Sequence, residues 1–267
     1  MRPVTCRRLV IRVSRYALSF STVNPEAEGS PVVYEPYNVR SGISVAANLR
    51  EAIKTADLPR QAYQRVLVMV DAPVQMVPVD LFDETESRLL YSHACSGLGN
   101  DVIMHNVLPD LNAVALFAVN KDLKLVIDDN FPGATFMCAV SPVWRYLHQR
   151  SFVGARNKLY GYFHDRRLEV FGFRQRRFKY CNSFEAANAQ DALYYLMNVW
   201  KQMMLKPEHD ELHIVGDIPE QDRMLDELRQ FLQRAYIINP SGDFNRAPVT
   251  QIKGMPYDLM TFYVKGR

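Results

Sequence analysis

Apolar and polar positions follow the same order twice along the chain. Residues 8–23 alternate between apolar and polar side chains, and the interruption at Ser14 predicts two short strands joined by a tight turn. From residue 157 the pattern returns, with strands expected at 159–163 and 168–173. Each half then continues with a third strand, a helix and a buried strand, so the order of elements indicates an internal duplication.

The remaining elements follow from the period of the apolar positions. Apolar residues three and four apart predict helices, and short continuous apolar runs predict buried strands. In the first half these rules predict strands at 32–37, 65–70, 77–82, 102–108, 113–119 and 135–140 and helices at 43–56, 83–94, 121–130 and 142–149. In the second half they predict strands at 178–181, 212–215 and 235–238, helices at 183–205 and 221–235, and a last element at 259–264.

The composition is that of an ordinary globular protein. The 267 residues are 48% apolar and 23% charged, and the formal net charge of +3 is too weak to argue for nucleic-acid binding by itself. The four cysteines are far apart and form no CxxC pair, which favours reduced thiols. Arginines interrupt the N-terminal apolar positions, and no run approaches the ~20 apolar residues of a membrane span. We therefore expect a cytoplasmic protein without direct membrane insertion.

The duplicated order of elements resembles the actin-like ATPase superfamily. It is closest in pattern to the pilus-assembly and type II secretion cytoplasmic members, and it also looks like an uncharacterised bacterial family near that superfamily. The resemblance covers most of the chain and implies an α/β fold, a two-lobed, ribonuclease H-like duplication with mixed sheets and an inserted α+β subdomain. On this basis the first lobe would span residues 1–152, with the insertion at about 71–135, and the second lobe would span residues 153–267.

The resemblance also locates an interlobe cleft, where members of the superfamily bind ATP. Their first hairpin carries Asp-x-Gly, but Arg12 stands here in place of the acid and Ser14 in place of the glycine. A guanidinium group cannot ligate Mg²⁺ or act as a base at neutral pH. The second hairpin has Gly161 without an acid, and the strand-end Gly-Gly signature reads Gly216-Asp217. These departures argue against ATP hydrolysis, although they leave open whether a ligand binds the cleft.

The second predicted hairpin is rich in basic residues interleaved with aromatic ones. The candidate basic surface consists of Arg166, Arg167, Arg174, Arg176, Arg177 and Lys179. Such a surface could bind nucleic acid or an acidic partner. The alternative interpretation, which the pattern favours, is a pair of charged turns joining strands of the core.

No complete catalytic or metal-binding motif is found in the sequence. The segment from His209 to His213 has two histidines, but a zinc helix needs a glutamate directly after the first one. Residues 96–100 lack the third glycine of a dinucleotide fingerprint, and neither GxxxxGK[ST] nor GxSxG occurs. We therefore predict no catalytic residue, no metal site and no cofactor.

These observations together favour a non-catalytic protein of actin-like fold that acts as a scaffold or binds a partner. We expect that partner to be another protein, a second copy of the chain included. Two alternatives stay open: an atypical ATP-dependent phosphotransferase or ATPase, and a nucleic-acid-associated protein that uses the basic hairpin at 164–179.

Overall fold

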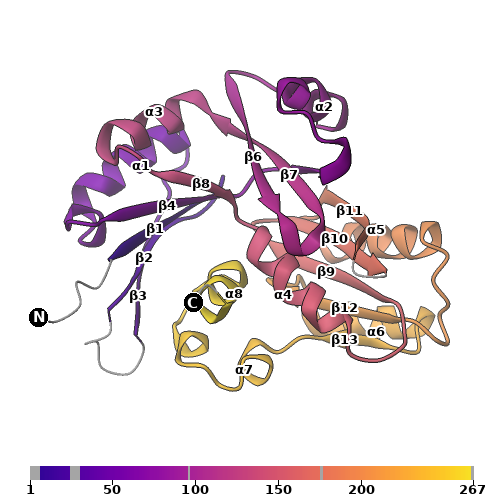
Figure 1. Ribbon diagram of the computed structural model, residues 1–267. Coiled ribbons are helices and arrows are strands. Elements are labelled where there is room, and N and C mark those ends of the chain that lie inside the picture. The colour runs from indigo at the N-terminus through magenta and orange to yellow at the C-terminus, as the bar shows by residue number, and fades with distance from the viewer. Residues whose placement is uncertain (1–6, 25–30, 96, 175–176, 266–267) are drawn as a thin grey trace, which may run out of the picture.

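The computed structural model describes residues 7–24, 31–95, 97–174 and 177–265, and it contains two five-stranded mixed sheets (Figure 1). Sheet A has the order β3-β2-β1-β4-β8, and sheet C has the order β11-β10-β9-β12-β13. The strands of sheet A are β1 (Arg8–Val13), β2 (Leu18–Val23), β3 (Val32–Tyr37), β4 (Arg65–Val70) and β8 (Thr135–Cys138). The strands of sheet C are β9 (Lys158–His164), β10 (Arg167–Arg174), β11 (Arg177–Glu185), β12 (Glu211–Gly216) and β13 (Ala235–Ile237). The two sheets therefore share one topology, in which an antiparallel meander is followed by two parallel strands.

Helices cover the outer face of each sheet (Figure 1). In β1, Leu9, Ile11 and Val13 belong to the core cluster that also holds residues of α1 (Val45–Thr55) and α3 (Lys121–Asn130). On sheet C the outer helices are α5 (Ala189–Gln202) and α6 (Gln221–Phe231). Side chains alternate across a strand, so the even-numbered residues of β1 face the other way, toward the middle of the molecule.

Two helices exchange sides between the sheets. Helix α4 (Ser141–Ser151) follows β8 of sheet A, yet its Trp144 packs edge-on against Phe171 of sheet C, with ring centroids 6.5 Å apart. Helix α8 (Tyr257–Lys265) follows the strands of sheet C, yet its Leu259 belongs to the core cluster of Val10 in sheet A. A division of the chain near residue 152 remains a prediction, and it would separate each of these helices from the sheet that it covers.

Residues between β4 and β8 build a smaller layer on sheet A. Sheet B has the order β5-β7-β6, with β5 (Val74–Pro78), β6 (Asp101–Leu108) and β7 (Ala113–Asn120). Alternate residues of β7 serve two cores: Ala115 and Phe117 face the main core, while Val114 and Leu116 pack with Tyr91 of α2 (Ser87–Ala94). The short elements are α7 (Pro240–Asp243) and the 3₁₀ helices η1 (Leu58–Arg60), η2 (Val79–Leu81), η3 (Glu84–Glu86), η4 (Pro109–Leu111) and η5 (Pro248–Gln251).

Some predicted boundaries are wrong, for a physical reason in each case. The helix predicted over 183–205 begins at Ala189, because β11 continues to Glu185, which pairs with Arg167 of β10. Asn188, and not Ser183, caps this helix by accepting a hydrogen bond from the backbone of Asp191. The strand predicted at 77–82 ends at Pro78 and continues as η2. No helix in the described ranges is long and apolar enough to cross a membrane.

Candidate functional site

Arg12 lies at the junction of the two sheets and joins three separate parts of the chain. Its position on β1 turns the side chain toward α8, and the residue is only 3% exposed. The guanidinium Nε donates hydrogen bonds to both oxygens of Asp258 on α8, at 3.0 and 2.9 Å, and Nη2 donates to Asp165 in the β9–β10 turn at 3.0 Å. One buried cation therefore connects sheet A, sheet C and the last helix.

The charge on Arg12 is held by its surroundings. Burial alone would lower the pKa of Arg12, but the carboxylate of Asp258 outweighs it and raises that pKa well above its usual value. The hydroxyl of Tyr162 also donates to Asp258, at 3.1 Å, and burial raises the pKa of this phenol, with Asp258 adding to the shift. Arg12 and Asp258 thus form a charged pair, and the neutral hydroxyl of Tyr162 donates a further hydrogen bond to the same Asp258 carboxylate.

A second buried cluster lies beside the first one. Asp71 directly follows β4, and its Oδ2 lies 3.5 Å from Nδ1 of His164 at the end of β9. Nε2 of the same ring lies 3.6 Å from Glu169 on β10. Arg167 reaches both carboxylates, at 3.4 Å from Asp71 and 3.2 Å from Glu169. This cluster therefore also bridges the two lobes, because Asp71 belongs to sheet A and the other three residues belong to sheet C.

The pKa values in this second cluster are shifted toward charged groups. Burial alone would lower the pKa of His164, but the carboxylates of Asp71 and Glu169 raise it to about 10. Burial alone would raise the pKa of Asp71, but His164 and Arg167 hold it well below its usual range. At neutral pH the junction is therefore an array of alternating charges that holds the lobes together.

Two of the predicted cleft residues have local structural roles. Ser14 Oγ donates to the carbonyl of Ala17 at 3.1 Å and accepts from its amide at 2.9 Å, so the hydroxyl closes the β1–β2 turn. Gly216 has φ +100°, and a Cβ there would lie 2.0 Å from the carbonyl oxygen of Phe163. This glycine is required by the close approach of β12 and β9, whether or not a phosphate binds nearby.

Asp217 and Gly161, two further predicted cleft residues, face different parts of the molecule. Asp217 follows Gly216 at the junction, and burial raises its pKa, with the charge of Asp165 adding to the shift. Gly161 does not line the junction, because its Cβ position faces Leu196 of α5 at 3.1 Å. On β9 the residues that face the junction are Tyr162 and His164, one and three positions beyond Gly161. Of the five predicted cleft residues, the structure brings Arg12 and Asp217 near the same acids.

The predicted basic surface is not continuous in the described part of the chain. The guanidinium of Arg166 lies over the ring of Tyr16, 5.1 Å from its centroid, and Arg167 is engaged in the buried cluster. Lys179 is exposed on β11. Arg174 and Arg177 pair at the ends of β10 and β11, while their side chains and Arg176 lie outside the described residues.

Sequence reasoning missed the acids that define this site. Asp71 had a usable signal, since it directly follows a buried parallel strand, where functional side chains of α/β folds gather. Asp165 lies in the hairpin turn, four positions beyond Gly161. Asp258 had no local signal, because 246 positions separate it from Arg12.

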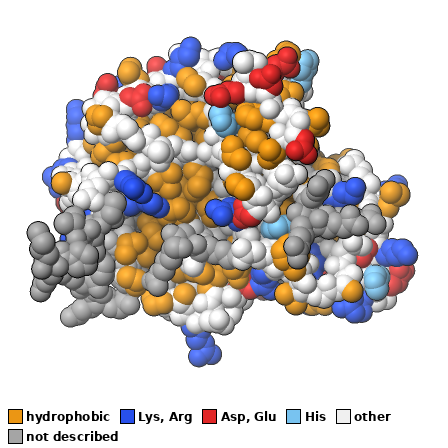
Figure 2. Space-filling view, viewed as in Figure 1, with side chains coloured by type: hydrophobic (Ala, Val, Ile, Leu, Met, Phe, Trp, Pro, Cys, Tyr) orange, Lys and Arg blue, Asp and Glu red, His pale blue; other side chains and the backbone are white. Residues whose placement is uncertain are grey.

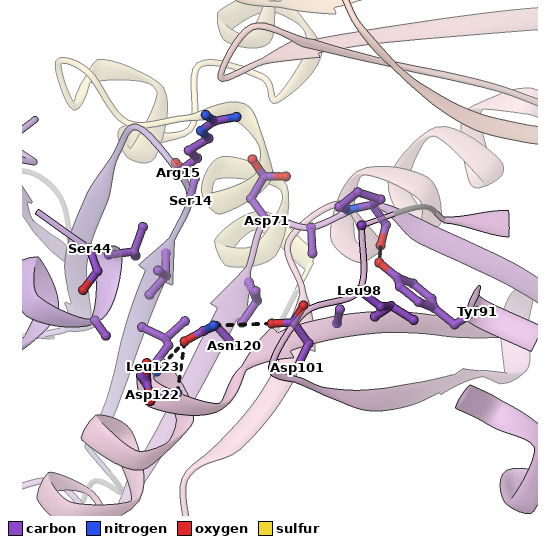
Figure 3. Close-up of a pocket in the computed structure, with 18 residues that line it drawn as sticks. Ser14, Arg15, Ser44, Asp71, Tyr91, Leu98, Asp101, Asn120, Asp122 and Leu123 are labelled. Atoms are coloured by element: carbon purple, nitrogen blue, oxygen red, sulfur yellow. Dashed lines mark hydrogen bonds between the residues drawn. The ribbon is translucent and has the colours of Figure 1, made fainter. Parts of the chain in front are cut away.

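A cavity of about 520 Å³ opens beside Asp71 on the side of the first lobe (Figure 3). Its lining includes the first turns of α1 and α3 and Tyr91 of α2. Its polar groups are largely bonded within the protein: Asn120 accepts from the backbone amides of Asp122 and Leu123, and Tyr91 donates to the carbonyl of Pro73. The side chains of Asn120 and Tyr91 are therefore occupied within the protein, while Arg15, a further donor, also lines the cavity.

Comparisons with known proteins agree with this architecture. The family model described as "Protein of unknown function (DUF3822)" matches residues 5–234. The chain belongs to this family. A protein of unknown function with an actin-like ATPase fold, from Bacteroides thetaiotaomicron, is 27% identical over 93% of this chain and 96% of its own, with a TM-score of 0.81. The PilM–PilN type IV pilus biogenesis complex matches at 12% identity over 88% of this chain and 89% of the other, with a TM-score of 0.59. No curated protein matches the sequence.

The DUF3822 chain therefore has the predicted two-lobed actin-like fold. The fold implies a magnesium-bound nucleotide between the lobes, but the residues at the junction do not fit that group. A guanidinium group occupies the β1 position, and it already bonds to Asp165 and Asp258. If a nucleotide displaced those acids, the buried charge of Arg12 would be left unpaired.

Proposed function

We propose that this DUF3822 protein is a non-catalytic member of the actin-like fold that acts by binding a protein partner in the cytoplasm. The observation that carries the proposal is the pairing of Arg12 with Asp165 and Asp258 across the two lobes. Nucleotide-driven proteins of this architecture need lobes that open around a ligand. Here buried ion pairs oppose that opening.

Two further observations support a binding role. The PilM–PilN complex shows that a protein complex can include a similar fold, at a TM-score of 0.59. On one face of the molecule, apolar side chains gather over β4, β8 and α8 (Figure 2). A hollow of about 520 Å³ lies between β6, β8, α4 and α8, and its lining includes Leu67, Phe136, Met137 and Phe262. We expect a partner to pack its own apolar side chains into this hollow.

The first test asks whether the protein uses nucleotide. Thermal unfolding and phosphate release are measured with millimolar Mg-ATP and Mg-GTP. We expect no turnover and no rise in the unfolding temperature, because bound ligand would raise it by mass action. A nucleotide-dependent rise that is lost in Arg12→Met would replace the proposal with the ATPase alternative.

The second test concerns the partner. A partner captured from the native cell is purified, and its binding is measured with and without Mg-ATP. Met137→Glu, in the apolar hollow, should weaken binding at least tenfold, whereas Leu125→Glu, on the exposed face of α3, should not. Binding that requires ATP, or that Met137→Glu leaves unchanged, would contradict the proposal.

The nucleic-acid alternative has less support from the structure. Arg166 and Arg167, two of the residues on which it depends, already contact Tyr16 and the buried acids. It predicts affinity that falls steeply with salt and is lost when Arg174, Arg176 and Arg177 are reversed in charge.

A further inference from the structure

The junction contains an imidazole and two carboxylates in a geometry that suits a metal ion. One ligand atom from each of Asp71, His164 and Asp165 lies within 4.8 Å of the others. Asp71 follows β4 of sheet A, whereas His164 ends β9 of sheet C and Asp165 starts the turn after it. An ion bound by these three side chains would therefore have ligands from both lobes.

The buried ring of His164, which has no hydrogen-bond partner among the described residues, distinguishes this group from an ordinary acidic cluster. The residue is 3% exposed, and neither ring nitrogen makes a hydrogen bond to any described residue. Its Nδ1 lies 3.5 Å from Oδ2 of Asp71, beyond the roughly 2.7–2.9 Å of a charge-assisted hydrogen bond. Two ligands of a tetrahedral metal, each at about 2.0–2.1 Å from the ion, stand about 3.3 Å apart. The separation is thus closer to that of two metal ligands than to that of a donor and an acceptor.

The charges of the junction also favour a cation. The described acids of the two clusters and the adjoining strand end are Asp71, Asp165, Glu169, Asp217 and Asp258. Among the described residues, the arginines that pair with these acids are Arg12 and Arg167. A metal ion ligates the imidazole in its neutral form, so binding releases the His164 proton; the acids then outnumber the cations in a buried region, where a divalent ion is strongly attracted.

The two arginines are placed to orient the ligands. Arg12 bonds to Oδ2 of Asp165, and Arg167 lies 3.4 Å from Oδ1 of Asp71, so the Oδ2 of Asp71 is left facing His164. Partners of this kind around a site fix the direction of the ligand atoms and raise metal affinity.

We propose that Asp71, His164 and Asp165 bind one divalent transition-metal ion of the Zn²⁺ class, which ties the two lobes together without a nucleotide. Imidazole nitrogen with carboxylate oxygen suits zinc better than magnesium, which prefers oxygen ligands and retains its water. The role of the ion is structural, because it links sheet A to sheet C at the point where the lobes meet.

The test uses the full chain, stripped of metal with EDTA and titrated with ZnCl₂, MnCl₂ or MgCl₂ in the absence of nucleotide. Calorimetry should give one Zn²⁺ per chain, with a higher unfolding temperature and with Mg²⁺ much weaker. His164→Asn and Asp165→Asn should each weaken Zn²⁺ binding by about 100-fold or more. His213→Asn, which removes a histidine paired with Glu211 outside the junction, should leave the affinity within about threefold.

Unfolding curves measured in EDTA show whether each variant folds without metal, so a loss of binding can be distinguished from a loss of folding. His164 is buried and Asp165 is 13% exposed, so Asp165→Asn is the milder change, and its circular dichroism should match that of the wild type. The proposal is overturned if Zn²⁺ does not bind stoichiometrically. It is also overturned if a folded Asp165→Asn variant binds Zn²⁺ as tightly as the wild type, or if only His213→Asn weakens binding.

Discussion

Replacing Arg12 with methionine tests the central ion pair directly. The change removes the hydrogen bonds to both oxygens of Asp258, which is 0% exposed, and the bond to Asp165. Removing one partner of a buried pair costs about 3–5 kcal/mol, because the other charge stays buried and unpaired. Since Tyr162 still donates to Asp258, we expect a loss near 3 kcal/mol. In a chain of this length, that loss corresponds to a fall of roughly 5 °C in the unfolding temperature.

A double-mutant cycle separates the pair from the effect of the new side chain. Asp258→Leu alone should destabilise the protein by a similar amount, and the double variant should lose less than the two single losses added together. Urea unfolding is followed by tryptophan fluorescence and by circular dichroism, and coincident transitions justify a two-state analysis. Arg223→Met is the matched control, since it breaks ion pairs at the exposed surface and should leave the midpoint unchanged. A loss below about 1 kcal/mol for Arg12→Met, or additive single losses in the double variant, would refute the reasoning.

Three other predictions concern single residues. Gly216→Ala should lower the free energy of unfolding in urea by at least about 3 kcal/mol, because φ is +100° and the new Cβ would lie 2.0 Å from a backbone oxygen. The control Gly254→Ala, at φ +75° with no atom within 4 Å, should lower it by only about 1 kcal/mol. Equal losses in the two variants would contradict this account. The thiol of Cys138 is fully buried, and burial raises its pKa to about 12. Mass spectrometry should therefore find Cys138 unlabelled by iodoacetamide at pH 8 until the protein unfolds. Labelling at the rate of a free thiol would disprove this. Burial lowers the pKa of His213, so the unfolded chain binds a proton there more readily than the folded protein, and stability should decline as pH falls below about 6.5. His213→Asn should therefore make the urea midpoint less dependent on pH between pH 7.5 and 5.5. An unchanged pH dependence would exclude this contribution.

The strands and the duplication could be predicted because their signals are local. The side-chain patterns of β1 and β9, which are buried almost throughout, and the short apolar run of β4 are visible within a few residues. The orientation of β9 could not be predicted as easily, since it depends on where the hairpin turns. Asp165 and Arg166 both have positive φ, 45° and 63°, and this two-residue turn places His164, not Gly161, at the junction.

The site was only partly predictable from the sequence. The arginine at position 12 is visible in the sequence, but its partners depend on tertiary packing. Asp258 reaches Arg12 only because α8 returns to sheet A, and no local pattern contains that information. The interpretation of Arg167 as a surface residue was wrong for a similar reason, since Asp71 and Glu169 draw it into the interior.

The exchange of α4 and α8 has a consequence for how the protein is made. The ribosome completes β8 at Cys138 but does not reach α8 until Tyr257, roughly 120 residues later, which takes on the order of 6–24 s at 5–20 residues per second. During that interval the inner surface of sheet A, including Val10 and Met69, has no covering helix. The nascent chain therefore exposes apolar surface of its earliest-made half until the last segment emerges, and such surface favours aggregation during synthesis.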